Sequence, residues 1–265
     1  GTELLQAGPE YRVWRAPLAN SMDPWGSQVY GDDHLTPGLG RSIENQLRTL
    51  GLDRMHNRVD TVKVAVMDSA VRIDVYAYSL GSGTSGFERR ETWTVRGDGR
   101  IQLRMNVQPQ GAMPEHLPKS GLELRLPQSM NRIRWYGRGP FETYPDRKTG
   151  AKIGVYESTA EQEIVPYLIP QDYGNHTDVR WLRVMNDAEH GLLLRSDQLL
   201  NFSLHPYCTD HLSRAVYRFQ LQRAPFNTLH IDFDVTGVGG TAIRTLPQYR
   251  VRPENQSYEL EIQPF

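Results

Sequence analysis

The chain has little cysteine, no charge excess and no long apolar run. Cys208 is the one cysteine among 265 residues, which excludes an intrachain disulfide framework and a metal site built from several cysteines. Lys and Arg number 30 and Asp and Glu number 31, which gives a net charge of −1. This balance predicts no nucleic-acid partner. No apolar run approaches the roughly 20 residues that span a bilayer, so no membrane partner is predicted either.

Helical patterns are also scarce. Residues 42–52 are expected to form a short helix after the glycine-rich loop 38–40, and Thr209 is a candidate N-cap for one or two helical turns. Apolar and polar residues alternate elsewhere, which places one face of a strand on a core and the other face in water. The alternation predicts strands at residues 62–66, 71–76, 101–107, 122–126, 153–156, 179–185, 192–195, 202–204, 229–235 and 258–262.

Turn residues separate these strands. Asp68-Ser69 and Asp98-Gly99 predict hairpins, and the glycine-rich residues 81–86 predict a flexible hairpin tip. More than a dozen short strands with few, short helices predict an all-β fold, a large antiparallel sandwich formed by residues 1–265 as one domain. Residues 19–40 are expected to be a mobile loop. Because the chain opens on Gly1 without a leader, we expect it to be excised from a longer protein.

Residues 134–147 concentrate glycines, prolines, aromatic rings and charges in one non-helical run. Gly137 and Gly139 are expected to adopt backbone angles that other residues avoid. Carboxylates and arginines lie beside flat aromatic faces, a combination that suits a hydroxyl-rich ligand. A second polar cluster, residues 175–180, follows a loop between predicted strands, where binding residues concentrate.

The central segment resembles the C-terminal domain of the large bacterial β-galactosidases, glycoside hydrolase family 2, where the pattern is approximately G-x-G-P-x-E-x-Y-x-D-R. The residues that fit it without a gap are Gly137, Gly139, Pro140, Glu142, Tyr144, Asp146 and Arg147. Four further blocks match in order. They are Trp14 to Pro17 with Asn20, a stretch from Tyr167 to Trp181, Phe202 to Tyr207 with Leu212, and the glycine turn 237–240.

This resemblance implies a galactose-mutarotase-like supersandwich that binds carbohydrate. It also implies a parent that hydrolyses terminal β-galactosides with retention, using glutamates of a separate catalytic barrel. The present domain would then be a non-catalytic wall of the active site and inactive alone. Its partners would be the barrel, the other domains of the parent and the carbohydrate substrate. Parents of this kind are often oligomers that hold Mg and Na in other domains, so no cofactor is expected here. A cytoplasmic or periplasmic location in a bacterium stays open.

One position departs from the family pattern. After the glycine turn the family commonly has D-D-S-W, whose tryptophan lines the galactoside pocket, whereas this chain has Thr241, Ala242, Ile243 and Arg244. Arg244 therefore falls at the tryptophan position. An arginine there favours a relative that acts on another β-glycoside, such as an acidic one with which an arginine could pair.

Retaining glycosidases need two carboxyl groups about 5–5.5 Å apart. Glu142 and Asp146 lie close in sequence, but the resemblance places catalysis in another domain. We therefore expect these two carboxylates to orient Arg138 and Arg147 through charge-assisted hydrogen bonds. The candidate substrate-binding residues are Arg138, Glu142, Tyr144, Asp146, Arg147, Asn175, His176, Arg180 and Arg244. No catalytic residue is predicted.

Other readings of the chain stay open. The eight histidines show no metal-binding spacing, so no metal site is predicted. Trp181 alternates with Val179 and is expected in the core. A stand-alone carbohydrate-binding module is one alternative function. A mutarotase or epimerase of the same fold is another, since a histidine acid with a carboxylate base can open a sugar ring, although no motif assigns a histidine to this role.

Overall fold

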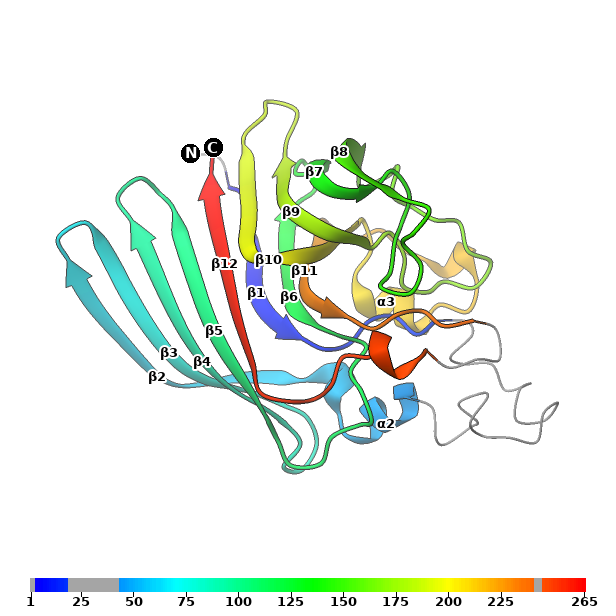
Figure 1. Ribbon diagram of the computed structural model, residues 1–265, viewed down its shortest axis with the longest axis horizontal. Coiled ribbons are helices and arrows are strands. Elements are labelled where there is room, and N and C mark those ends of the chain that lie inside the picture. The colour runs from blue at the N-terminus through cyan, green and yellow to red at the C-terminus, as the bar shows by residue number, and fades with distance from the viewer. Residues whose placement is uncertain (1–2, 19–42, 241–244) are drawn as a thin grey trace.

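The computed structural model describes residues 3–18, 43–240 and 245–265 (Figure 1). Within these residues lie twelve strands and two short α-helices, and every strand pairing is antiparallel. The predicted all-β antiparallel fold is confirmed. The predicted loop 19–40 lies outside the described residues, as does Arg244.

The strands are β1 (Ala7–Arg12), β2 (His56–Met67), β3 (Ala70–Leu80), β4 (Gly86–Arg96), β5 (Ile101–Gln110), β6 (Lys119–Pro127), β7 (Arg132–Gly139), β8 (Lys152–Thr159), β9 (His176–Met185), β10 (Gly191–His205), β11 (Phe226–Val235) and β12 (Gln256–Pro264). The helices are α2 (Ile43–Thr49) and α3 (Thr209–Arg214), with 3-10 turns η1 (Leu52–Arg54), η2 (Arg218–Gln220) and η3 (Pro247–Tyr249). Helix α3 begins at Thr209, so its N-cap is Cys208. The prediction of Thr209 as N-cap was therefore wrong by one residue.

The long strand β10 joins three parts of the sheet. Along one edge it pairs with β12 at residues 192–195 and then with β11 at residues 201–205. Along most of its length it also pairs with β9, with the register broken between Arg195 and Leu200. One arm therefore runs β12-β5-β4-β3-β2, a second runs β11-β6-β1, and a third runs β9-β7-β8. Figure 1 shows the first arm as a broad sheet on the left and β7, β8 and α3 on the right.

Two predicted strands, 192–195 and 202–204, are both parts of β10. The ten predicted ranges therefore correspond to nine of the twelve described strands. The pattern analysis missed β1, β4 and β7. In β4 the run from Phe87 to Val95 mixes charges into both faces, which hides its alternation.

The alternation predicted the buried faces of most strands, but two strands differ. All of β2, the outer strand of its arm, is exposed, including Val62, Val64 and Val66, because no described element packs extensively on either of its faces. In β11 nearly every residue is buried on both faces, including His230 and Asp232. Its polar residues have buried partners: Lys119 of β6 contacts both His230 and Asp232, and Thr209, at the start of α3, lies 3.2 Å from the His230 ring.

Trp181 was also misplaced by the pattern. Asp178 has a φ of 56°, and the β9–β10 register is broken beside it. These two irregularities shift the alternation, so that Leu182 faces the core together with Val179. Trp181 is only partly buried and lies on the outer face of β9.

The main hydrophobic core draws buried side chains from most strands of the sheet, among them β7, β9 and β10. The Trp135 side chain is fully buried, with ring centroids 4.3 Å from His176 and 5.5 Å from Phe202. Its indole N–H donates to the Arg138 carbonyl at 2.9 Å. Trp135 thus anchors the part of the central segment that lies in β7.

We expect Trp135→Ala to lower the free energy of unfolding by about 3–5 kcal/mol, because it empties a large buried site. Tyr136→Ala is the matched control, since Tyr136 is the next residue on the same strand and is 37% exposed. Its loss should stay below about 1 kcal/mol. Urea unfolding of both variants measures the difference; equal losses would contradict this placement of the core.

Candidate functional site

The central segment begins as strand and ends as loop. Residues up to Gly139 belong to β7, and a cis peptide bond joins Gly139 to Pro140. Neither Gly137 nor Gly139 has a positive φ, so the expected unusual backbone angles are absent there. Glycine is required at both positions because there is no room for a side chain. A Cβ on Gly137 would lie 2.9 Å from Val179, and one on Gly139 would lie 2.7 Å from the Tyr156 ring.

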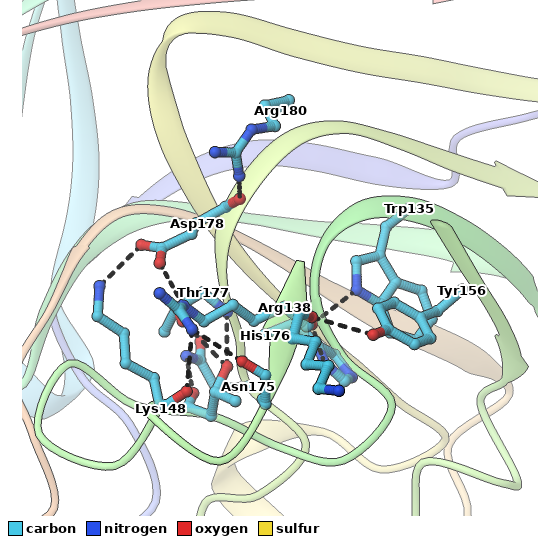
Figure 2. A network of polar contacts seen from close by, with 12 residues as sticks. Trp135, Arg138, Lys148, Tyr156, Asn175, His176, Thr177, Asp178 and Arg180 are labelled. Carbon is cyan, nitrogen blue, oxygen red and sulfur yellow. Dashed lines mark hydrogen bonds and ion pairs between the residues drawn. The ribbon is translucent and has the colours of Figure 1, made fainter. Parts of the chain in front are cut away.

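Asp178 joins the loop after β7 to the start of β9 (Figure 2). Its carboxylate accepts hydrogen bonds from Arg138 Nε at 2.5 Å and Lys148 Nζ at 2.8 Å. Arg138 also donates to the carbonyls of Lys148 and Ala151, at 3.1 and 2.8 Å. Burial would raise the pKa of Asp178, but the hydrogen bonds from Lys148 and Arg138 outweigh it and hold this pKa below its usual value.

Glu142 forms a second centre. Its carboxylate accepts hydrogen bonds from Arg147, from the Tyr167 hydroxyl and from the backbone amide of Gly174, the last at 2.8 Å. The predicted pairing of Glu142 with Arg147 is confirmed. These bonds fasten the loop that precedes β9 to the central segment.

Asp146 has different partners from those expected. Its two carboxylate oxygens accept the backbone amides of Val238 and Gly239, at 2.9 and 2.7 Å. The prediction that Asp146 orients an arginine of the segment was wrong, since Arg147 binds Glu142 and Arg138 binds Asp178. A carboxylate suits this position because the turn presents two successive amide donors.

Arg15 holds the same glycine turn from the other side. Its guanidinium donates to the carbonyls of Thr236 and Gly237, at 2.7 and 3.0 Å, and is only 7% exposed. Space is tight here as well, because a Cβ on Gly237 would lie 2.4 Å from the Asp146 carboxylate. The turn is therefore fixed just before residues 241–244, which lie outside the described part of the chain.

Three other candidate residues are buried and hydrogen-bonded within the protein. Tyr144 is 1% exposed, and its hydroxyl donates to Asp172 at 3.2 Å. Asn175 donates to the Thr143 carbonyl at 2.7 Å. His176, fully buried, lies 2.7 Å from the Glu163 carboxylate. All three stabilise the loops around the segment, and contact with a ligand stays a prediction.

The structure therefore brings the candidates together in separate groups. Arg138, Asn175 and His176 surround the start of β9 (Figure 2). Glu142 and Arg147 lie together, whereas Asp146 belongs to the glycine turn. Arg180 points to the outer face of β9, where its guanidinium lies 5.2 Å from the Tyr136 ring centroid. The Glu142 and Asp146 carboxylates thus bind different partners.

A buried set of titratable side chains was missed by the sequence patterns. Lys119 Nζ lies 2.7 Å from His230 Nδ1 and 3.3 Å from the Asp232 carboxylate, and the His205 ring is 5.6 Å from that of His230. Burial raises the pKa of Asp232 to about 6. Burial and then the Lys119 charge lower the pKa of His230 well below its usual value. The alternation of polar and apolar residues in 229–235 was the available signal, but it predicted solvent on that face.

The other residues missed by sequence reasoning are Arg15, Lys148, Glu163 and Asp172. Arg15 lies in a block that was noted for its resemblance, yet nothing in the spacing predicts its contact with a turn more than 200 positions later. Among the described residues, no group of three or more His, Cys, Asp or Glu side chains is arranged to hold a metal ion. No helix in the described part of the chain is long and apolar enough to cross a membrane.

The described residues line at least two hollows on the surface. One, the aromatic crater, has a volume of about 520 Å³ and is lined among others by Leu168, Tyr173, Tyr207, Tyr217 and Phe219. The other has a volume of about 410 Å³ and is lined by Arg134, Val155, Arg180, Trp181, Arg183, Leu193 and Arg195. Leu168 and Phe219 are 85% and 84% exposed, which is unusual for large apolar side chains gathered at one place.

Fold and site together define a large antiparallel β domain whose loops are fixed by ion pairs. The chain matches the family model of the β-galactosidase small chain over residues 1–263, and it belongs to that family.

Relatives with the printed name β-galactosidase occur in several bacteria. That of Priestia megaterium is 29% identical over 260 residues, covering 97% of this chain and 23% of the relative. That of Arthrobacter is 28% identical over 271 residues, covering 98% and 26%. A β-galactosidase BgaC of Bifidobacterium adolescentis is 36% identical over 153 residues, covering 56% and 14%. The chain thus spans about a quarter of the length of the first two relatives.

Solved structures with partial likeness include an aldose epimerase homologue from C. elegans, with a TM-score of 0.39 and 11% identity. This match covers 78% of this chain and 69% of that one. A galactose 1-epimerase from Lactobacillus acidophilus has a TM-score of 0.38 and 6% identity, with coverage of 80% and 66%.

We expect Asp178→Asn to destabilise the chain by about 1 kcal/mol at pH 7, because Arg138 and Lys148 lose their shared carboxylate. Asn tolerates the positive φ of this position, so the backbone should not change. The folded state lowers the pKa of Asp178, so the ionised carboxylate stabilises the fold. This stabilisation is present above pH about 4 and is lost as the pH falls further.

Thermal or urea unfolding at pH 7 and at pH 3 measures this dependence. The difference between wild type and Asp178→Asn should shrink at the lower pH. Asp210→Asn, which breaks an exposed ion pair with Arg214, is the control and should change little. A difference that does not depend on pH would contradict the role assigned to the Asp178 charge.

The lowered pKa of His230 predicts a second pH effect. A histidine held neutral in the folded state stabilises the chain above its unfolded pKa of about 6.5, and this stability is lost on acidification. His230→Gln should therefore reduce the loss of stability between pH 7 and pH 5, by at most about 2 kcal/mol. The raised pKa of Asp232 acts in the opposite direction, so Asp232→Asn should make that loss steeper. Urea unfolding across this range measures both slopes, and identical slopes in the two variants would contradict the assignment.

Proposed function

We propose that the chain is the non-catalytic small-chain domain of a family 2 glycoside hydrolase of the β-galactosidase type. In this proposal it forms one wall of a pocket in which terminal β-galactosides are hydrolysed with retention. The family match and the quarter-length coverage of the relatives support it. The observation that carries it is the glycine turn held between Asp146 and Arg15.

The turn supports the proposal for a geometric reason. Four hydrogen bonds fix residues 236–239, and residues 241–244 follow at once. A wall that orients a substrate must be rigid, since a misplacement of about 1 Å can cost a hundredfold in rate. The strands and ion pairs behind the turn supply such rigidity. Arg244, in the segment that follows, is kept as a proposed substrate-binding residue.

The aromatic crater supports a partner within a longer protein. Its rim exposes Leu168, Tyr217 and Phe219, and the last two rings stack with centroids 5.5 Å apart. Exposed apolar groups gathered in this way mark a surface that another protein surface covers. The catalytic barrel or another domain of the parent is the proposed partner.

The separate environments of Glu142 and Asp146 support a catalytic pair elsewhere in the parent. As parts of the same proposal, Mg and Na bind in other domains, the parent forms oligomers, and it acts in the cytoplasm or periplasm of a bacterium. A mutarotase is disfavoured, because His230, Lys119 and Asp232 are each at most 3% exposed and bind one another.

In the full-length parent, we expect Asp146→Ala to lower kcat/KM for nitrophenyl β-galactoside by about 10–100-fold, because the glycine turn loses two hydrogen bonds. The isolated 265-residue chain should not hydrolyse this substrate. Initial rates over a range of substrate concentrations measure both effects.

Asp210→Ala in the same parent is the control, since this exposed carboxylate lies on α3 and pairs with Arg214. A melting temperature within a few degrees of wild type would show that Asp146→Ala still folds. Hydrolysis by the isolated chain, or wild-type kinetics of Asp146→Ala, would reject the proposal.

A further inference from the structure

The outer face of β7, β8, β9 and β10 carries a second candidate binding surface. We call it the arginine face: Arg134, Arg180, Arg183 and Arg195, with Trp181 and Tyr136. All four arginines and Trp181 line the hollow of about 410 Å³. Cavities of this size, roughly 300–1,000 Å³, hold small ligands.

The strand register explains why these side chains meet. Tyr136, Trp181 and Arg195 are successive partners across β7, β9 and β10, and so form one row. Arg134 and Arg183 lie directly opposite each other in the next row. Like charges in this position destabilise a sheet. Folding alone therefore does not explain why two arginines occupy it.

Not all of the positive charge is neutralised. Arg134 pairs with Glu157 at 3.1 Å and Arg195 pairs with Glu261, so two glutamates face four arginines. No carboxylate of the described residues forms an ion pair with Arg180 or Arg183. Their guanidinium groups lie over aromatic rings instead, Arg180 over Tyr136 and Arg183 over Phe265 at 4.5 Å from the centroid. Arg180 also donates one N–H to the Asp178 carbonyl (Figure 2). Stacking on a ring holds a guanidinium in place without using its N–H donors, and the guanidinium has five of them, so others stay available for an anion.

We propose that the arginine face binds an anionic sugar, one whose pyranose ring lies against Trp181 and whose carboxylate or sulfate is held by Arg180 and Arg183. A guanidinium donates two parallel hydrogen bonds to a planar carboxylate. Trp181 supplies a flat apolar face beside them, and Val155 and Leu193 complete the apolar part of the lining. The site is distinct from the glycine turn and does not depend on the proposed hydrolysis.

The size and charge of the surface favour a sugar over a larger polyanion. Arg180 and Arg183 line the same hollow, and the chain as a whole has a net charge of −1. A nucleic acid binds to an extended basic surface, which this balance opposes. A short acidic saccharide needs only one or two cations and one ring platform.

The proposal is tested by titrating the 265-residue chain with digalacturonate and, separately, with neutral galactobiose. Calorimetry and Trp fluorescence measure the binding in each titration. The acidic disaccharide should bind at least tenfold more tightly, and its binding should weaken in high salt. A sulfated galactose disaccharide forms a third arm, which distinguishes carboxylate from sulfate as the preferred anion. Arg180→Gln with Arg183→Gln should reduce binding of the acidic sugar at least tenfold.

Three variants make the result specific. Arg183→Lys keeps the charge but loses the paired donors, so it should fall between wild type and the double variant. Trp181→Ala should weaken the binding of the acidic disaccharide. Arg214→Gln, on α3 and away from the arginine face, should bind like wild type. Three results would overturn the proposal. They are equal affinity for neutral and acidic sugars, no binding of either acidic sugar at about 10 mM, and tighter binding of an acidic peptide or an oligonucleotide.

Discussion

The pairing of one strand with three neighbours is the constraint on which the architecture depends. β10 has 15 residues, enough to serve β12 and β11 in succession on one edge and β9 on the other. Because backbone donors and acceptors fix these positions, the three arms of the sheet cannot move independently. The register break after Arg195 lets one strand follow two directions. A second register break, between Leu200 and Phe202, lies opposite Asp178, whose φ is positive.

The polar residues of the central segment act mainly on one another. Asp178 neutralises two cations, Glu142 collects three donors, and Asp146 accepts two amides of the glycine turn. Each carboxylate thereby connects segments that are far apart in sequence. Charge-assisted hydrogen bonds of this kind position loops more exactly than apolar contacts, because they depend on direction as well as on distance. A loop region with few strands of its own can then be as well ordered as the sheet behind it.

Local patterns predicted the elements and much less of the site. Alternation and turn residues predicted the all-β fold and the hairpins around Asp68 and Asp98. The pairing of Glu142 with Arg147 was also predictable, since five residues separate them. The partners of Asp146 and Arg15 were not, because these bonds span 92 and more than 200 positions. The predicted exposure of strand faces was wrong where tertiary contacts decide it. The polar residues His230 and Asp232 of β11 are buried against neighbours such as Lys119 of β6, whereas the described elements leave both faces of β2 exposed. Such coverage depends on the tertiary arrangement, which periodicity does not contain.

The exposed strand β2 gives this domain a route to aggregation through its sheet edge. Among the described strands it pairs only with β3, so its other backbone edge has no strand partner there, and it displays Val62, Val64 and Val66, the last 83% exposed. An edge of this kind is a template for intermolecular β-sheet growth. Charged side chains on β2 oppose such growth: Arg58 and Asp60 form an ion pair, and Lys63 adds a further charge. Replacing these three residues with apolar ones would make β2 a site from which β-sheet aggregates could grow.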